Sequence, residues 1–155
     1  FLMYASDYDD RLPQEWYPGS GGYPQDLQPY LASYNVFICP SHSDAVSTSY
    51  GMPAWTAWMA RWYAAASLAG PDRPTTTFLL AENWSSWYST RDPVHWPSPW
   101  WPEGNNVAWT RHNDGANYAF VDGHVKWLRR DRSYRPECMW WPWPHQPSGE
   151  CGGRS

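Results

Sequence analysis

The pattern of apolar and polar positions predicts a β-hairpin near the C-terminal third of the chain. Asp122-Gly123 lies between two runs rich in β-branched and aromatic residues and favours a type I′ turn with a two-residue loop. Such a loop would pair residues 118–121 with residues 124–127 in reverse order. Alternation then places one aromatic set on the face that packs on a core: Tyr118, Phe120, Val125 and Trp127. The other face would carry Ala119, Val121, His124 and Lys126.

Helical spacing of apolar residues predicts two helices in the first half of the chain. Residues 27–34 fit one if Pro29 lies in the first turn, and residues 54–68 fit a longer one that stops before Gly70-Pro71. Compact apolar runs predict strands at 36–39, 49–52, 75–81 and 106–110, whereas 7–22 should be a loop. The expected class is α+β, with a small antiparallel sheet of about four strands and an inserted helix.

Length and charge narrow the function classes. A chain of 155 residues is long enough for one core and short for two. Its net charge is −4, so we do not expect the basic surface that binding to nucleic acid or to an anionic membrane requires. Arg129, Arg130 and Arg132 form a local basic cluster, which Asp131 interrupts, and we interpret it as a solvated strand end.

Ordered landmarks along the chain resemble one bacterial family. His112 is followed by nine residues and then Asp122-Gly123, the spacing of the prepilin-type H-x9-DG group. Residues 1–130 contain further landmarks in the same order: YASDYDDRLP at 4–13, LQPYL at 27–31, VFICPS at 36–41, SYGM at 49–52 and FLLAE at 78–82. The resemblance implies a head similar to those of type IV pilins and type II secretion pseudopilins, which have a long N-terminal helix followed by an antiparallel sheet.

This resemblance also implies an organisation and a function. Residues 1–6 would be the end of the N-terminal helix, 1–133 a pilin-like head and 134–155 a Pro/Trp/Cys-rich extension. No run reaches the roughly 18 apolar residues of a membrane span, so we expect the chain as written to be soluble and its membrane anchor to lie upstream of Phe1. The implied function is a structural, non-enzymatic filament subunit. It would associate with copies of itself at the bacterial surface or outside the cell.

Three cysteines cannot all pair within the chain. Cys138 and Cys151 are the closest in sequence, and we favour a disulfide between them that closes a loop in the tail. The alternative pairs Cys39 with one of the two tail cysteines. No C-x-x-C occurs, so the spacing does not suggest a cysteine-based zinc site.

Tryptophan is unusually frequent, at 14 of 155 residues, and much of it lies in proline-rich segments. We favour a structural interpretation in which the indoles cover the sheet or a neighbouring subunit. The alternative is a secreted carbohydrate-binding module whose exposed indoles stack on sugar rings. The candidates for either role are Trp100, Trp101, Trp140, Trp141 and Trp143.

Candidate catalytic residues are few. Ser41, His42 and Asp44 are too close in sequence to converge readily as nucleophile, base and orienting group, and we expect a turn there. Glu82 and Glu103 could form a glycosidase pair, but we expect Glu82 to bond backbone or arginine groups instead. A metal-dependent hydrolase is therefore a third alternative, behind the filament subunit and the carbohydrate-binding module.

Metal and glycan sites are also possible. His112, Asp114, Asp122 and His124 could hold Zn²⁺ around the hairpin, although we favour the interpretation that His112 hydrogen-bonds the turn beginning at Asp122. Asp7, Asp9 and Asp10 offer the oxygen ligands that Ca²⁺ prefers. Asn83-Trp84-Ser85 is a glycosylation sequon, so Asn83 could carry a glycan in an extracellular protein.

Overall fold

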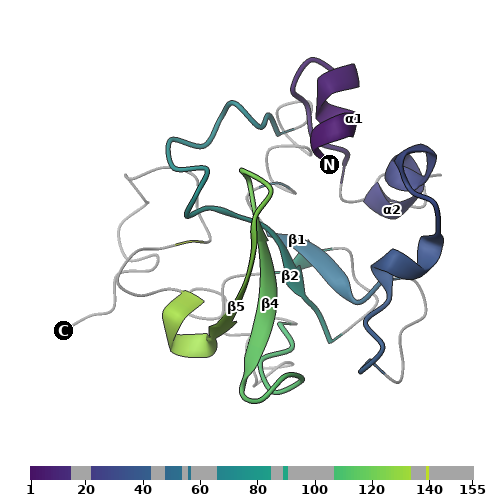
Figure 1. Cartoon of the computed structure of the whole chain (residues 1–155). Helices are drawn as coiled ribbons and strands as arrows, with labels where there is room; N and C mark the ends of the chain where they lie inside the picture. Colours follow the sequence, from purple (N-terminus) through teal and green to yellow (C-terminus); the bar gives the residue numbers. More distant parts are fainter. Residues whose placement is uncertain are drawn as a thin grey trace.

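The centre of the molecule is an antiparallel sheet (Figure 1). The computed structural model describes residues 1–14, 22–42, 48–53, 56, 66–84, 89–90, 107–133 and 139. Within these ranges the antiparallel strands follow the spatial order β1 (Tyr50–Pro53), β2 (Phe78–Glu82), β4 (Gly115–Phe120) and β5 (Val125–Arg129). The two-residue β3 (Ser89–Thr90) pairs parallel to β1 at the opposite edge from β5. Sheet and helices together confirm the expected α+β class.

The helices are short. α1 (Leu2–Asp7) confirms the predicted N-terminal helix, and α2 (Tyr23–Leu27) continues into the 3-10 helix η1 (Gln28–Tyr30). The predicted helix 27–34 is wrong, because Pro29 lacks the N–H that an α-helix needs and the α-helical segment ends at Leu27. The predicted strand 36–39 is also wrong, since the 3-10 helix η2 (Tyr34–Phe37) occupies its first half and residues 38 and 39 belong to no strand.

The other predicted elements had mixed outcomes. β1 and β2 confirm the strands expected at 49–52 and 75–81, with β2 starting three residues late. In place of the strand expected at 106–110, Val107 forms an isolated bridge with Asn83. Most of the helix predicted at 54–68 lies outside the described residues; of those described, Thr56 is helical, whereas residues 66–68 are not.

The β4–β5 hairpin has a different register from the predicted one. Asn117 pairs with Trp127 and Ala119 with Val125, so the loop has three residues, 121–123. Gly123 alone among them has a positive φ, +94°, and its N–H donates to the carbonyl of Phe120 at 2.9 Å. This is the geometry of a three-residue hairpin loop with glycine last, and not of a type I′ turn.

The one-residue shift decides which side chains of β5 are buried. Tyr118 and Phe120 are buried as expected, but they share their face with Leu128, the only buried residue of β5. Val125 and Trp127 point to the other face and are 66% and 43% exposed. The predicted common aromatic face is therefore wrong for β5.

Two hydrophobic clusters occupy the two faces of the sheet. On one face Phe78 stacks on Tyr118 with ring centroids 4.3 Å apart. The other buried residues of this cluster are Ala81, Val107, Trp109, Ala116, Phe120 and Leu128. On the other face α1, α2 and their connections pack over Met52 and Leu80, and Figure 1 shows both helices on the same side of the sheet. The buried residues of this second cluster are Leu12, Tyr23, Leu27, Phe37, Met52, Ala66, Leu79 and Val121.

η3 (Arg130–Ser133) follows β5 directly. Arg129 and Asp131 are exposed, and their charged groups lie 3.8 Å apart, as expected for a solvated strand end. Arg130 lies over the ring of Trp109, 4.9 Å from its centroid, and this cation–π contact covers part of the indole. Within the described part of the chain, no helix is long and apolar enough to cross a membrane.

Candidate functional site

Three segments far apart in the sequence bring a thiol, a carboxylate and an imidazole together. Cys39 follows η2, Glu82 ends β2, and His112 lies shortly before β4. The ligand atoms of these three side chains all lie within 4.8 Å of one another. We call them the Cys-Glu-His cluster.

The strand pairing holds the carboxylate of Glu82 in place. Glu82 is completely buried and directly follows Ala81, which pairs with Tyr118 of β4. The backbone N–H of Asn117 donates to Oε2 at 2.8 Å, and its side-chain amide donates to Oε1 at 3.2 Å. The His112 ring adds a contact from Nε2 to Oε1 at 2.8 Å. A buried carboxylate requires such donors, so the expectation that Glu82 bonds backbone is confirmed.

A second set of hydrogen bonds fixes the backbone of Cys39. Its N–H donates to Oγ of Ser49 at 2.8 Å, and Nδ1 of His42 lies 3.0 Å from the same oxygen. Nε2 of His42 lies 3.1 Å from the carbonyl of Trp84, which can only accept, so this nitrogen carries the proton. In the neutral ring with this tautomer, Nδ1 accepts a hydrogen bond from the Ser49 hydroxyl. Cys39 is buried and its thiol is free.

The orientation of His112 excludes one kind of chemistry. The same atom, Nε2, faces both Glu82 Oε1 at 2.8 Å and Cys39 Sγ at 3.4 Å. A nucleophile–base–carboxylate relay uses both ring nitrogens, one toward the nucleophile and the other toward the carboxylate. The cluster is therefore not arranged as a cysteine-based catalytic triad. It is a set of three donor atoms that converge on one point.

The surroundings of the cluster are partly aromatic and partly cationic. The indole N–H of Trp127 donates to the carbonyl of His112 at 2.8 Å and so anchors its backbone to β5. A guanidinium N–H of Arg111 donates to the carbonyl of Asn83 at 2.6 Å, and the same group lies 4.9 Å from the ring centroid of Trp84. His112 is the exposed member, with 28% of its side chain accessible.

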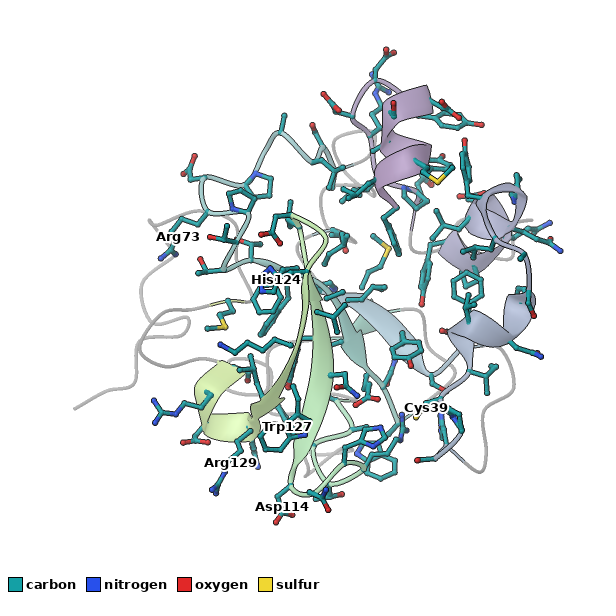
Figure 2. The ribbon with its side chains drawn as sticks, viewed as in Figure 1. Cys39, Arg73, Asp114, His124, Trp127 and Arg129 are labelled. Atoms are coloured by element: carbon teal, nitrogen blue, oxygen red, sulfur yellow. The ribbon has the colours of Figure 1, made fainter. Side chains whose placement is uncertain are left out.

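The metal site predicted around the hairpin is not formed. The hairpin separates its members, because His112 and Asp114 precede β4 at one end whereas Asp122 and His124 lie at the turn, as the labelled Asp114 and His124 in Figure 2 illustrate. His112 bonds Glu82 and not the turn, so that prediction is also wrong.

At the turn, Asp122 and His124 form a separate exposed pair. Asp122 Oδ1 lies 2.6 Å from Nδ1 of His124 and accepts its backbone N–H at 3.2 Å. Desolvation alone would raise the pKa of Asp122, but the side-chain and backbone hydrogen bonds from His124 outweigh it and lower that pKa.

Other sequence candidates are dispersed or differently engaged. Asp7 accepts a hydrogen bond from the hydroxyl of Tyr30 at 2.8 Å, which raises the pKa of Tyr30 to about 12. Among the described residues, Asp9 and Asp10 belong to no group of potential metal ligands. Asn83 is fully buried, which leaves no room for a glycan in this fold.

Several candidates lie outside the described residues. They are Asp44, Trp100, Trp101, Glu103, Cys138, Trp140, Trp141, Trp143 and Cys151. The favoured disulfide and the tryptophan surface therefore remain predictions.

The Cys-Glu-His cluster was not predicted from the sequence, although the sequence contains a signal for it. Each member lies in a different landmark of the H-x9-DG resemblance: Cys39 in VFICPS, Glu82 in FLLAE, and His112 at the start of the motif. Considering which landmarks carry ionisable groups would have suggested that they meet.

Comparisons with family models, with curated proteins and with solved structures found no match to this chain. The resemblance to the H-x9-DG group therefore rests on the landmarks themselves.

Proposed function

We propose that the chain is the head of a structural filament subunit, similar to a pilin or pseudopilin, and that it self-associates outside the bacterial cell or at its surface. The observation that carries the proposal is an apolar surface at the β5 edge of the described sheet. Val125 and Trp127 are exposed there on the same face of β5. Exposed apolar side chains on an edge strand favour association with another chain.

An apolar groove continues this surface. It has a volume of about 400 Å³ and extends from Val125 across Ala119 and Leu80 toward Leu31 and Phe37. Its lining is predominantly apolar, which suits the side chains of another subunit better than it suits a polar substrate. We call Val125, Trp127 and this groove the edge surface.

The contact between helix α1 and the hairpin also supports the proposal. A Cβ atom added to Gly123 would lie 3.0 Å from Cδ1 of Leu2, so the side chain of Leu2 packs directly against the turn. Phe1 and Tyr4 pack on the helix-covered core. The DG turn thus steadies an N-terminal helix relative to the sheet, as a filament subunit requires if that helix carries the assembly contacts.

Substitution at the edge surface tests the proposal. In the full-length protein, Val125→Asp should abolish filaments seen by electron microscopy, because it buries a carboxylate in the subunit interface. Lys126→Asp introduces the same group at the adjacent exposed position on the opposite face of β5 and should leave filaments intact. Filaments unaffected by Val125→Asp, or an upstream sequence with an ordinary cleavable signal peptide, would contradict the proposal.

The carbohydrate-binding alternative makes a different prediction. Binding of the chain to a glycan array, lost in Trp100→Ala or Trp141→Ala, would favour a secreted binding module over a filament subunit.

A further inference from the structure

We propose that Cys39, Glu82 and His112 form a binding site for a zinc ion. Thiolate sulfur, imidazole nitrogen and carboxylate oxygen are the three ligand types that Zn²⁺ takes in proteins, whereas Ca²⁺ and Mg²⁺ prefer oxygen alone. A thiolate among the donors selects a borderline or soft ion. The site adjoins the edge surface, because Trp127 anchors His112 and Asn117 lines the groove, but the zinc proposal does not depend on the filament proposal.

Two of the donor-atom distances are close to those around a tetrahedral ion, and all three lie within 4.8 Å. Bonds of about 2.0 to 2.3 Å place the ligands of tetrahedral Zn²⁺ about 3.3 to 3.8 Å apart. Cys39 Sγ and His112 Nε2 are already separated by 3.4 Å. His112 Nε2 and Glu82 Oε1, at 2.8 Å, need to separate by roughly 0.5 Å, which a small rotation of the exposed imidazole provides.

Hydrogen bonds satisfy the carboxylate of Glu82, but the single site at Nε2 of His112 cannot serve both Glu82 and the thiol of Cys39 fully. Nε2 of an imidazole has either one proton or one lone pair. If Nε2 donates its proton to Glu82, that N–H is not directed at Cys39 Sγ, and Nε2 has no lone pair left for the thiol. The thiol proton then cannot be donated to Nε2. A cation at the centre of the cluster would satisfy all three donor atoms at once.

Charge and surroundings favour the ion as well. One thiolate and one carboxylate neutralise the two positive charges of Zn²⁺, so the loaded site adds no net charge to the interior. Asn117 orients Glu82 through both carboxylate oxygens, and the Ser49 hydroxyl fixes the backbone of Cys39. Such supporting hydrogen bonds typically accompany metal ligands.

The exposed side of His112 determines the remaining coordination position. Because 28% of its side chain is accessible whereas Cys39 and Glu82 are buried, the fourth ligand would be water from the solvent side. The three protein ligands come from the segment after η2, from β2 and from the segment before β4, so the ion would cross-link parts of the chain separated by 43 and 30 positions. Binding of zinc at this site should therefore stabilise the folded chain.

Cobalt substitution tests the site directly. In the whole chain with Cys138→Ser and Cys151→Ser, Cys39 is the sole thiol. One equivalent of Co²⁺ should give a thiolate-to-cobalt charge-transfer band together with the visible bands of four-coordinate cobalt, and Zn²⁺ should displace both. All three proposed ligands are intact in this protein, so absence of the charge-transfer band would overturn the proposal.

Variants then assign the ligands. Cys39→Ser should remove the band, and His112→Gln and Glu82→Gln should each weaken zinc binding on the order of 100-fold or more, with Asn117→Ala losing about 10-fold. Asp114→Asn removes an exposed carboxylate two residues from His112 and should change affinity less than about 2-fold, since it touches no ligand. Zinc should also raise the melting temperature of the starting protein and not that of Cys39→Ser. Equal zinc affinity in all of these variants would overturn the assignment.

Discussion

Two separate features of Gly123 disfavour a side chain at this position. Its φ of +94° lies in the region that L side chains rarely adopt, and a Cβ there would approach Leu2 to 3.0 Å. The close atom is the far end of a flexible leucine, which can move. The positive φ should therefore account for most of the stability lost on any substitution of Gly123.

Gly123→Ala should lower the free energy of unfolding by about 1–2 kcal/mol, because alanine resists a positive φ. Urea denaturation measures the change. A double-mutant cycle with Leu2→Ala separates the two features, since it removes the close contact and leaves the φ unchanged. A cost that disappears in the Leu2→Ala background would show that the contact, and not the backbone, constrains this position.

Single residues were predictable from the sequence only where they act locally. Asp122-Gly123 identified the turn because turn chemistry depends on neighbouring residues. The partner of His112 was not predictable in the same way. The imidazole bonds Glu82, 30 positions away, because the β2–β4 pairing brings the end of one strand beside the start of the other.

In the β4–β5 hairpin, a register shift of one residue changes which side chains of β5 lie on each face of the sheet. With a three-residue loop, Trp127 lies on the face of Gly115 and Asn117, and its indole reaches His112. A Cβ added to Gly115 would lie 2.3 Å from the indole ring, which no adjustment of the ring in place could relieve. Gly115 is thus the space that allows the indole to cross the strand.

Gly115→Ala should destabilise the protein by about 1–3 kcal/mol, because it forces the indole out of its position and breaks the bond to the His112 carbonyl. Chemical denaturation measures the loss. Trp127→Leu provides the matched background, since without the indole the added methyl group has room. Gly115→Ala should then be nearly neutral, and an undiminished cost in that background would contradict the packing argument.

Helices and strands were predicted correctly where the apolar pattern and the residues that end an element indicated the same boundaries. β1 and β2 are apolar runs bounded by Pro53 and by the turn at residues 74–76, and both were expected. Residues 27–34 have helical spacing, but Pro29 interrupts the hydrogen-bond ladder and the chain forms 3-10 turns instead. Local spacing does not determine whether a proline lies within a helix or after its end.

The whole molecule depends on one sheet with a hydrophobic cluster on each face. Tyr118 belongs to the cluster opposite the helices and stacks on Phe78. Burial, the largest cause, raises the pKa of the Tyr118 phenol, and the nearby Ser133 side chain lowers it by less. Because the sheet joins the two clusters, loss of this packing should unfold both together.

Tyr118 should therefore couple alkaline unfolding to its ionisation. A raised folded-state pKa means that the neutral phenol stabilises the fold fully below the ordinary value of 10, and that this contribution is lost as the pH rises further. Ultraviolet absorbance of tyrosinate and far-ultraviolet circular dichroism, followed together, should show one tyrosine ionising only as the secondary structure melts. Tyr118→Phe keeps the stacked ring without the ionisable group, so it should shift the alkaline transition to higher pH. An unchanged transition midpoint in Tyr118→Phe would show that another group controls alkaline unfolding.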